Sequence, residues 1–143
     1  MERYQVSPSL IILEIQEQAI YDDIDRNVKI IAACKEYGFM ISIGDFSSGH
    51  SFLDVMRRVP TDSIKLSGEF LPQGEVTEKD RIVVKKIIDV AKELGIQVIG
   101  EGIKTENQLK FLKSMGCSVV QGYSYPEPVP EEEFEEMIFH DEM

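Results

Sequence analysis

Five apolar stretches of this chain each carry a polar side chain at or near their end, and the types of these side chains point to ion and phosphate chemistry. They are Glu14 in IILEIQE, Asp45 in SIGDF, Lys65 in SIKLS, Glu101 in VIGEG and Gln121 in VVQGY. A charge buried without a partner costs several kcal/mol, so these groups are expected to converge on one site. Carboxylates with one lysine predict a site for a hard metal ion and a phosphate. A structural network of ion pairs, such as Glu14 with Lys65, is the alternative interpretation.

Asp45 lies within the most informative stretch, ISIGDFSSGHSF, where an apolar strand runs into a small, polar loop. In parallel α/β folds the chemistry lies at the carboxyl ends of the strands, so Asp45 is a candidate site residue. Ser47, Ser48 and Gly49 follow directly and are common turn residues for conformational reasons. A role for Asp45 as a turn cap therefore stays open.

The elements that position these residues follow from apolar periodicity and from glycine and proline stops. Strands alternate with helices along the whole chain, and a loop over residues 68–77 is expected to cover the site. Thr105 is expected to cap the helix that follows it. The expected strands are residues 10–15, 39–43, 63–66, 97–99 and 118–120; the expected helices are 19–37, 52–56, 80–94 and 105–115, with an acidic terminal helix from about 130.

Strictly alternating strands and helices predict an α/β fold with a parallel sheet and right-handed crossovers. The strands are expected to be apolar on both faces, as such a sheet requires. A complete (β/α)8 barrel has eight units in about 250 residues, and this chain has about five units in 143 residues. The sequence therefore predicts one domain over residues 1–143, built as a partial (β/α)8 barrel of the TIM type.

Composition excludes several classes of partner. The formal charge of −11 argues against binding a nucleic acid polymer, whose phosphates require a basic surface. The apolar run at residues 10–13 is far shorter than the roughly 20 residues of a membrane span, so no membrane segment and a cytoplasmic location are expected. Cys34 and Cys117 lack the nearby Cys or His partners of a zinc site and are expected to be reduced thiols.

Five ordered motifs give the chain a family resemblance. LEIQEQ, IGDFSSGHSFL, DSIKLSGEF, IGEGIKTENQ and CSVVQGYSYPEP resemble, in order and spacing, the C-terminal half of the EAL domain, the cyclic di-GMP phosphodiesterase family. The resemblance covers residues 7–130. It implies a (β/α)8-type barrel and hydrolysis of cyclic di-GMP to pGpG with two Mg²⁺ or Mn²⁺ ions. It also implies a homodimer or association with other signalling domains.

The resemblance assigns roles to six residues of this chain. In the family's motifs, the matching positions bind metal, act at the attacking water, or hold the substrate and the loops around it. The assignments are metal binding for Glu14 and Asp45, catalysis for Lys65 and Glu101, and substrate binding or loop positioning for Glu17 and Gln121.

Several positions depart from the family pattern. Gly44 stands where the first, metal-binding aspartate of DDFG is expected, and strand parity places Gly44 on the inward face of the barrel. Lys104, Ser67 and Ser47 replace a glutamate, an aspartate and a glycine of other motifs. The sequence contains no EAL tripeptide and no metal-binding asparagine strand. We therefore expect a degenerate, noncatalytic module that acts by regulatory binding of cyclic di-GMP or by protein association.

Two alternatives stay open at this point. The first is an active phosphodiesterase whose missing N-terminal half comes from another polypeptide, and the second is a structural fragment without a ligand. In either case Lys65 is expected to pair with Glu14 or Glu101 when no metal is present. An incomplete barrel would also expose inward residues such as Ile12 and Ile99, which favours self-association. A second possible contact is the family's dimer segment, residues 47–57.

Overall fold

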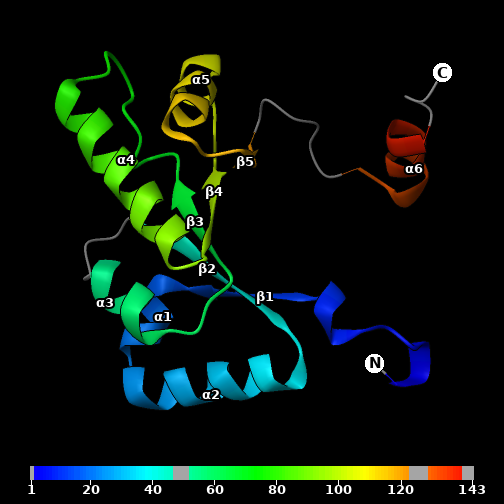
Figure 1. Cartoon of the computed structure of the whole chain (residues 1–143). Coiled ribbons are helices and arrows are strands. Elements are labelled where there is room, and N and C mark those ends of the chain that lie inside the picture. Colours follow the sequence, from blue (N-terminus) through cyan, green and yellow to red (C-terminus); the bar gives the residue numbers. More distant parts are fainter. Residues whose placement is uncertain (1, 47–51, 123–128, 140–143) are drawn as a thin grey trace.

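Five parallel strands form one sheet in which the spatial order of the strands is the order of the sequence (Figure 1). The structure is a computed structural model, and it describes residues 2–46, 52–122 and 129–139. Each neighbouring pair of strands is parallel. These findings confirm the expected α/β fold with five parallel strands. The strands are β1 Ile12–Gln16, β2 Met40–Phe46, β3 Ser63–Ser67, β4 Gln97–Glu101 and β5 Val119–Val120.

Helices occupy the connections between the strands, and their ends follow the local sequence signals. Thr105 caps its helix as expected, because its hydroxyl accepts from the backbone N–H of Gln108 in a capping box. Gly38 and Gly116 end two helices in the left-handed conformation, with φ of 105° and 91°. The helices are α1 Glu17–Tyr21, α2 Ile24–Tyr37, α3 Phe52–Arg58, α4 Glu78–Glu93, α5 Glu106–Met115 and α6 Glu131–Phe139, with short 3-10 turns at Glu2–Tyr4 and Pro8–Leu10.

The helix expected over residues 19–37 is in fact two helices. Asp23 separates α1 from α2, and its carboxylate accepts from the backbone N–H of Arg26, which makes Asp23 the N-cap of α2. The apolar periodicity continues across the break because Ile20 of α1 and Ile31 of α2 both enter the core. The prediction of a single helix was wrong because it relied on apolar periodicity alone, which gives no information about a cap.

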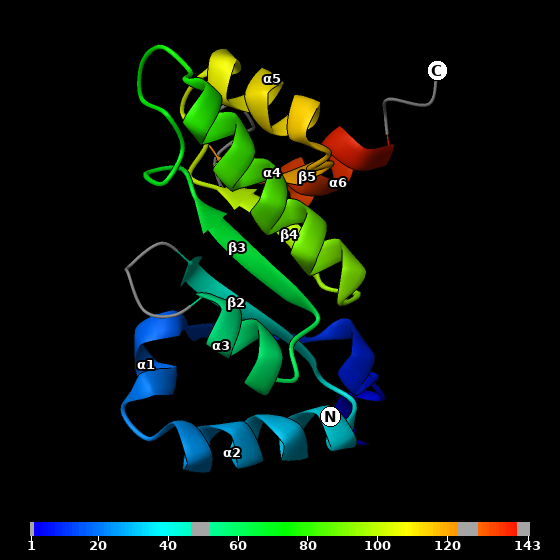
Figure 2. The ribbon, with the colours of Figure 1, turned by 60° about the vertical axis from the view of Figure 1, so that its left-hand side comes forward.

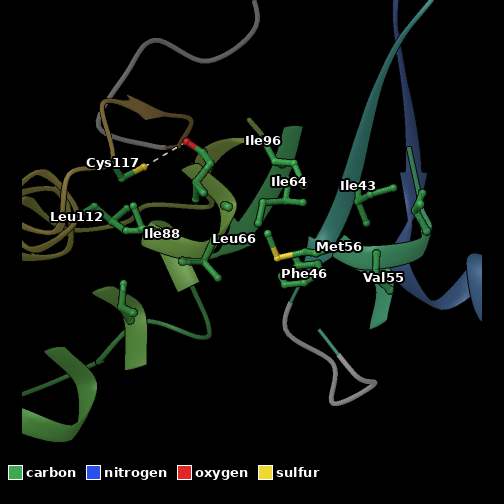
Figure 3. Close-up of a cluster of buried hydrophobic side chains, with 14 of the residues drawn as sticks. Ile43, Phe46, Val55, Met56, Ile64, Leu66, Ile88, Ile96, Leu112 and Cys117 are labelled. Atoms are coloured by element: carbon green, nitrogen blue, oxygen red, sulfur yellow. Dashed lines mark hydrogen bonds between the residues drawn. The ribbon is translucent and has the colours of Figure 1, made fainter. Parts of the chain in front are cut away.

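The core lies between the helices and one face of the sheet. Alternate strand residues, including Ile41, Ile43, Ile64 and Leu66, are buried there. Figure 3 shows Ile43, Ile64 and Leu66 packed with side chains of the helices, and it also shows the thiol of Cys117 donating to a backbone oxygen. Each fully buried aliphatic side chain contributes about 1.5–3 kcal/mol relative to an exposed one, so this layer accounts for much of the stability of the fold.

The opposite face of the sheet, which we call the open face, differs from what the sequence predicted. It is largely polar, so the expectation of strands apolar on both faces was wrong. Ile12 is 61% exposed there, as expected for an incomplete barrel, and Ile99 is half-buried. By strand alternation and register, the open face comprises Ile12, Glu14 and Gln16 of β1, Met40, Ser42 and Gly44 of β2, Ser63, Lys65 and Ser67 of β3, and Gln97, Ile99 and Glu101 of β4.

The helices occupy distinct parts of the molecule. Figure 2 shows α1, α2 and α3 grouped around β1 and β2, while α4 and α5 lie together beside β3 and β4. The two outer strands of the sheet are β1 and β5. Across the ranges that the structure describes, no helix has the length and apolar character needed to cross a bilayer.

Candidate functional site

The centre of the candidate site is an ion-pair cluster on the open face, formed by Glu14, Lys65 and Glu101. The ammonium nitrogen of Lys65 lies 2.6 Å from Oε2 of Glu14 and 3.3 Å from Oε1 of Glu101. The three residues come from β1, β3 and β4, so the cluster joins three strands of the sheet. The structure confirms the prediction that Lys65 pairs with Glu14 or Glu101, and Lys65 pairs with both.

Small residues of β2 allow this cluster to form. The strand lies between β1 and β3, so the Glu14–Lys65 pair spans it. Ser42 is opposite Glu14 in the register, and Gly44 is two residues further along. A Cβ atom built on Gly44 would lie 2.5 Å from Oε1 of Glu14, which is closer than such contacts occur. The glutamate carboxylate therefore occupies the space that a side chain at position 44 would need.

The electrostatics of the cluster favour a charged lysine. Burial of the Lys65 ammonium opposes its charge, but the hydrogen bond with Glu14 and the charge of Glu101 outweigh burial and raise the pKa of Lys65 above 10.5. The side chain of Lys65 is only 14% exposed. With two carboxylates and one ammonium, the cluster carries a net charge of about −1, which repels phosphate groups.

Two polar atoms near the cluster lack partners. Oε2 of Glu101 and the hydroxyl oxygen of Ser42 are buried, and neither has a hydrogen-bond partner within the described part of the chain. A buried polar atom left without a hydrogen bond costs roughly 1–3 kcal/mol. Ser42 is a site residue that sequence reasoning missed, although its alternation with Ile41 and Ile43 placed it on the inward face.

Asp45 does not join the cluster. The register between β2 and β3 shifts between Ile43 and Phe46, and Asp45 adopts a left-handed conformation with φ of 50° at this irregularity. Its side chain is exposed. A non-glycine residue at positive φ marks a local strain, and aspartate is one of the residues that tolerate it. The role of Asp45 as a metal ligand stays a prediction.

Glu17 lies directly after β1 and Gln121 directly after β5, the two outer strands of the sheet. Glu17 is the first residue of α1 and is 2% exposed. It lies near Tyr21: burial raises the pKa of that phenol, and the negative charge of Glu17 raises the pKa further. Gln121 follows β5, its side chain is exposed, and its backbone joins β5 to β4 through Gly100. Residues 47–51, which include Ser47 and part of the expected dimer segment, lie outside the described residues.

Close backbone packing fixes the chain on either side of Glu101. The backbone N–H of Gly68 donates to the carbonyl of Glu101 at 2.6 Å, and a Cβ on Gly68 would lie 2.4 Å from the carbonyl oxygen of Gly102. Gln108 is buried and accepts from the backbone N–H groups of Lys104 and Thr105. Sequence reasoning missed Gln108, but the capping-box spacing from Thr105 would have identified it.

Gly100 has a packing role. A Cβ at this position would lie 2.4 Å from Cδ1 of Leu112, so the absence of a side chain lets α5 approach β4. The close neighbour of Gly100 is therefore a helix side chain.

The residues present do not fit a two-metal centre. Within the ranges that the structure describes, no group of three or more His, Cys, Asp or Glu side chains is placed to hold a metal ion. The Lys65 ammonium lies between the two carboxylates, where a bound cation would otherwise balance them. Gly44 supplies no carboxylate. A divalent ion at Glu14 and Glu101 would have to displace Lys65 and would find too few oxygen ligands.

The sequence of the chain is similar to one known family and to proteins within it. The family model for the EAL domain matches residues 1–128. The chain is 32% identical over 138 residues to the cyclic di-GMP phosphodiesterase NbdA of Pseudomonas aeruginosa, an alignment that covers 96% of this chain and 18% of NbdA. The chain thus spans less than a fifth of the length of that relative.

Solved structures agree with the sequence comparison. The MucR phosphodiesterase of Pseudomonas aeruginosa, in complex with cyclic di-GMP, superimposes with a TM-score of 0.81 at 31% identity, covering 93% of this chain and 54% of the MucR chain. BlrP1 of Klebsiella pneumoniae, with manganese and cyclic di-GMP, gives a TM-score of 0.81 at 25% identity, covering 89% of this chain and 32% of the BlrP1 chain.

Proposed function

Because this chain belongs to the EAL domain family, we propose that it is a noncatalytic EAL module of cyclic di-GMP signalling that acts by protein association. Relatives in this family are cyclic di-GMP phosphodiesterases. The proposal for this chain departs from theirs in the chemistry of its site. Function depends on the residues of a site, and a shared fold does not by itself transfer an activity.

The observation that carries the proposal is Gly44, which supplies no carboxylate beside the cluster of Glu14, Lys65 and Glu101. In-line hydrolysis at phosphorus by two metal ions needs several oxygen ligands on each ion. Here the two carboxylates are neutralised in part by a lysine of the same chain, and position 44 offers no third carboxylate. The described residues therefore cannot assemble such a centre on their own.

The same electrostatics bear on ligand binding. Cyclic di-GMP carries two phosphates, and the cluster with its net negative charge disfavours a phosphate unless a cation intervenes. Binding of cyclic di-GMP by this chain is therefore disfavoured without a cation, and binding of Mg²⁺ or Mn²⁺ is disfavoured by Lys65 and by the few oxygen ligands beside it. Association with a second copy or with another signalling domain, in the cytoplasm, is the role that we propose instead.

The alternative function is phosphodiesterase activity in an assembled barrel. One observation favours it. Oε2 of Glu101 and the hydroxyl of Ser42 are buried without a partner in the described residues, and an N-terminal half of the barrel supplied by another polypeptide would give them partners. Even then the carboxylate at position 44 would be missing, and we expect at most weak activity.

The test is a paired assay of binding and turnover. Calorimetry measures heat on titrating cyclic di-GMP into this chain with and without Mg²⁺ or Mn²⁺, and chromatography measures pGpG after prolonged incubation. We expect no pGpG above background, with the MucR phosphodiesterase as positive control under the same conditions. Formation of pGpG in proportion to the concentration of this chain, through successive purification steps, would refute the noncatalytic assignment.

A further inference from the structure

Gln108, a buried residue of α5, forms hydrogen bonds with two loops that follow neighbouring strands. The residue is 5% exposed. Its Oε1 accepts from the backbone N–H groups of Lys104 and Thr105, at 2.9 and 3.3 Å, in the loop between β4 and α5. Its Nε2 donates to the carbonyl oxygen of Gly68, at 3.3 Å, in the loop after β3. A buried amide is costly unless it is hydrogen-bonded, and here both its oxygen and its nitrogen have partners.

The bond to Gly68 is the one that a helix cap does not require. The capping box of α5 needs an acceptor at the third helical position, and a glutamate provides that acceptor as well as a glutamine does. An ionised glutamate has no hydrogen to donate, so it cannot bind a carbonyl group. Glutamine at position 108 serves the cap and the Gly68 carbonyl together, which indicates a second role for this side chain.

The backbone of Gly68 also binds the backbone of Glu101. The N–H of Gly68 donates to the carbonyl oxygen of Glu101 at 2.6 Å. The two loops meet here without room for a side chain, because a Cβ on Gly68 would lie 2.4 Å from the carbonyl oxygen of Gly102. Gly68 is therefore bound to the end of β4 through its N–H and to α5 through its carbonyl.

Other donors to the Gly68 carbonyl come from its own loop. Nε2 of Gln73 lies 2.8 Å from this oxygen, and the backbone N–H of Leu71 donates to it at 3.3 Å. Loss of the Gln108 amide would therefore leave the carbonyl with partners. What would be lost is the side-chain bond that joins the loop after β3 to the first turn of α5.

The Lys65–Glu101 ion pair lies beside this connection. Its 3.3 Å separation is the longer of the two contacts of Lys65. Glu101 is the last residue of β4, and its register partner Ser67 is the last residue of β3. The position of a residue at a strand end depends on the loop that follows it. We propose that Gln108 is a positioning residue whose amide, by joining the loops after β3 and β4, holds Glu101 against Lys65.

This role goes beyond the proposed function, because it concerns how the cluster is held and not what the chain binds. Gln108 holds the same contact in a chain that associates with other proteins and in one that hydrolyses cyclic di-GMP. Formation of pGpG tests the noncatalytic assignment, whereas the energetic coupling of Lys65 with Glu101 tests the role of Gln108. The two proposals therefore fail independently.

Gln108→Glu separates the cap from the bond between the loops. The variant keeps an acceptor for Lys104 and Thr105 and places a carboxylate oxygen opposite the carbonyl of Gly68, where no hydrogen bond can form. Hydrogen exchange followed by NMR reports on the Gly68 amide, which donates to Glu101. The protection of this amide should fall about tenfold, and amides at the centre of the sheet should change less.

A double-mutant cycle measures the ion pair itself. Urea unfolding of Lys65→Met, Glu101→Gln and their combination gives the coupling between the two side chains. In the Gln108→Glu background this coupling should fall to about half or less, because the carboxylate is no longer held at contact distance. A residue that only stabilised α5 would lower the stability of all four proteins of the cycle equally and leave the coupling unchanged.

Two control variants are matched to the two effects of the substitution. Gln73→Glu adds the same charge and removes a donor to the same Gly68 carbonyl, but within a single loop. Thr105→Val removes the hydroxyl that accepts from the backbone N–H of Gln108 and so weakens the cap alone. The coupling of Lys65 with Glu101 should stay nearly unchanged in both controls. Circular dichroism checks that every variant keeps its helices.

Reduced coupling in Gln108→Glu, with unchanged coupling in both controls, supports the positioning role. An unchanged coupling in Gln108→Glu overturns it, even where the Gly68 amide loses protection, because Glu101 would then not depend on the loop. An equal loss of coupling in Gln73→Glu also overturns it, since the added charge would be the cause. An equal loss in Thr105→Val overturns it as well, because the cap would then be sufficient to explain the effect.

Discussion

A Cβ atom on Gly44 would lie 2.5 Å from Oε1 of Glu14, so the conformation of the glutamate depends on the absence of a side chain on the neighbouring strand. Gly44 has no positive φ, and any residue suits its backbone. The absence of a side chain on Gly44 leaves a space, and the Glu14 carboxylate that pairs with Lys65 fills it. The neighbour that would have to move is the end of a flexible side chain, which makes position 44 open to substitution.

Gly44→Asp should convert the cluster into a metal-responsive one. Without a divalent ion, the added carboxylate crowds and repels Glu14, and the free energy of unfolding should fall by about 1–3 kcal/mol. With Mn²⁺ present, two adjacent carboxylates gain a shared cation, and part of this loss should be recovered. Thermal unfolding with and without Mn²⁺ measures both effects.

Gly44→Asn is the matched control for that substitution. It adds nearly the same volume without a charge, so it should be destabilising by a similar packing cost but should respond less to Mn²⁺. An equal Mn²⁺ response in the two variants would mean that the cation binds elsewhere.

Lys65→Met should reduce stability by about 1–3 kcal/mol, because it leaves the Glu14 and Glu101 carboxylates without their shared cation. The cost stays below that of a fully buried pair, since Glu14 is 37% exposed. Lys110→Met, which removes an exposed pair with Glu106, should cost less than about 0.5 kcal/mol. Urea unfolding of the three proteins measures the differences, and equal losses would contradict a special role for the cluster.

The stabilisation by Lys65 should depend on pH in the alkaline range. The pKa of Lys65 is raised above 10.5 in the folded state, so the ion pairs contribute fully below pH 10.5. Their contribution is lost as the pH rises through the folded pKa. The stability gap between the unchanged chain and Lys65→Met should therefore be constant near neutral pH and shrink above 10.5. A gap that widens there would contradict the assignment.

Asp62→Asn should cost about 1–2 kcal/mol, because Asp62 accepts from Lys35 and from the backbone N–H of Ile41 at 2.8 Å. Burial opposes the charge of Asp62, but these two bonds outweigh burial and hold its pKa below 3.8. The contribution is present above pH 3.8 and lost as the pH falls through the folded pKa. Urea unfolding near neutral pH and well below 3.8 should show the gap to Asp62→Asn closing in acid.

Two isoleucines on opposite faces of the sheet test the assignment of the open face. Ile43 is fully buried, and Ile43→Ala should cost about 2–5 kcal/mol. Ile12 is 61% exposed, and Ile12→Ala should cost less than about 1 kcal/mol. Comparable losses in urea unfolding would show that the open face is covered in solution.

The elements that sequence reasoning placed best are those with strong local signals. Thr105 as an N-cap and the glycines at 38 and 116 marked helix ends, and the apolar runs located all five strands, with bounds that differ from the observed ones by up to three residues. The extent of β5 was overstated by one residue, because Ser118 offers no signal for or against pairing. Local signals therefore defined the order of elements with little dependence on tertiary structure.

The candidate site was harder to predict, because its geometry depends on contacts across strands. The sequence identified Glu14, Lys65 and Glu101 as strand-end charges, and the structure brings these three together. Nothing in the sequence marked the register irregularity at which Asp45 takes a left-handed conformation with an exposed side chain. The polar character of the open face was also missed, because a serine within an otherwise apolar strand does not indicate which face of the sheet is polar.

The order of the sheet has a consequence for how such a chain folds and evolves. Every strand pairs with the next strand in the sequence, so no pairing must wait for a distant segment. Each pairing still spans a whole βα unit, as between Ile12 and Met40, so it forms slowly in comparison with the contacts of a helical bundle, but stability can build up from one unit to the next as in repeat proteins. A terminal βα unit can be lost from or added to such a chain without a change in the pairing of the remaining strands. We therefore expect folding to begin within any adjacent pair of units and to spread along the chain.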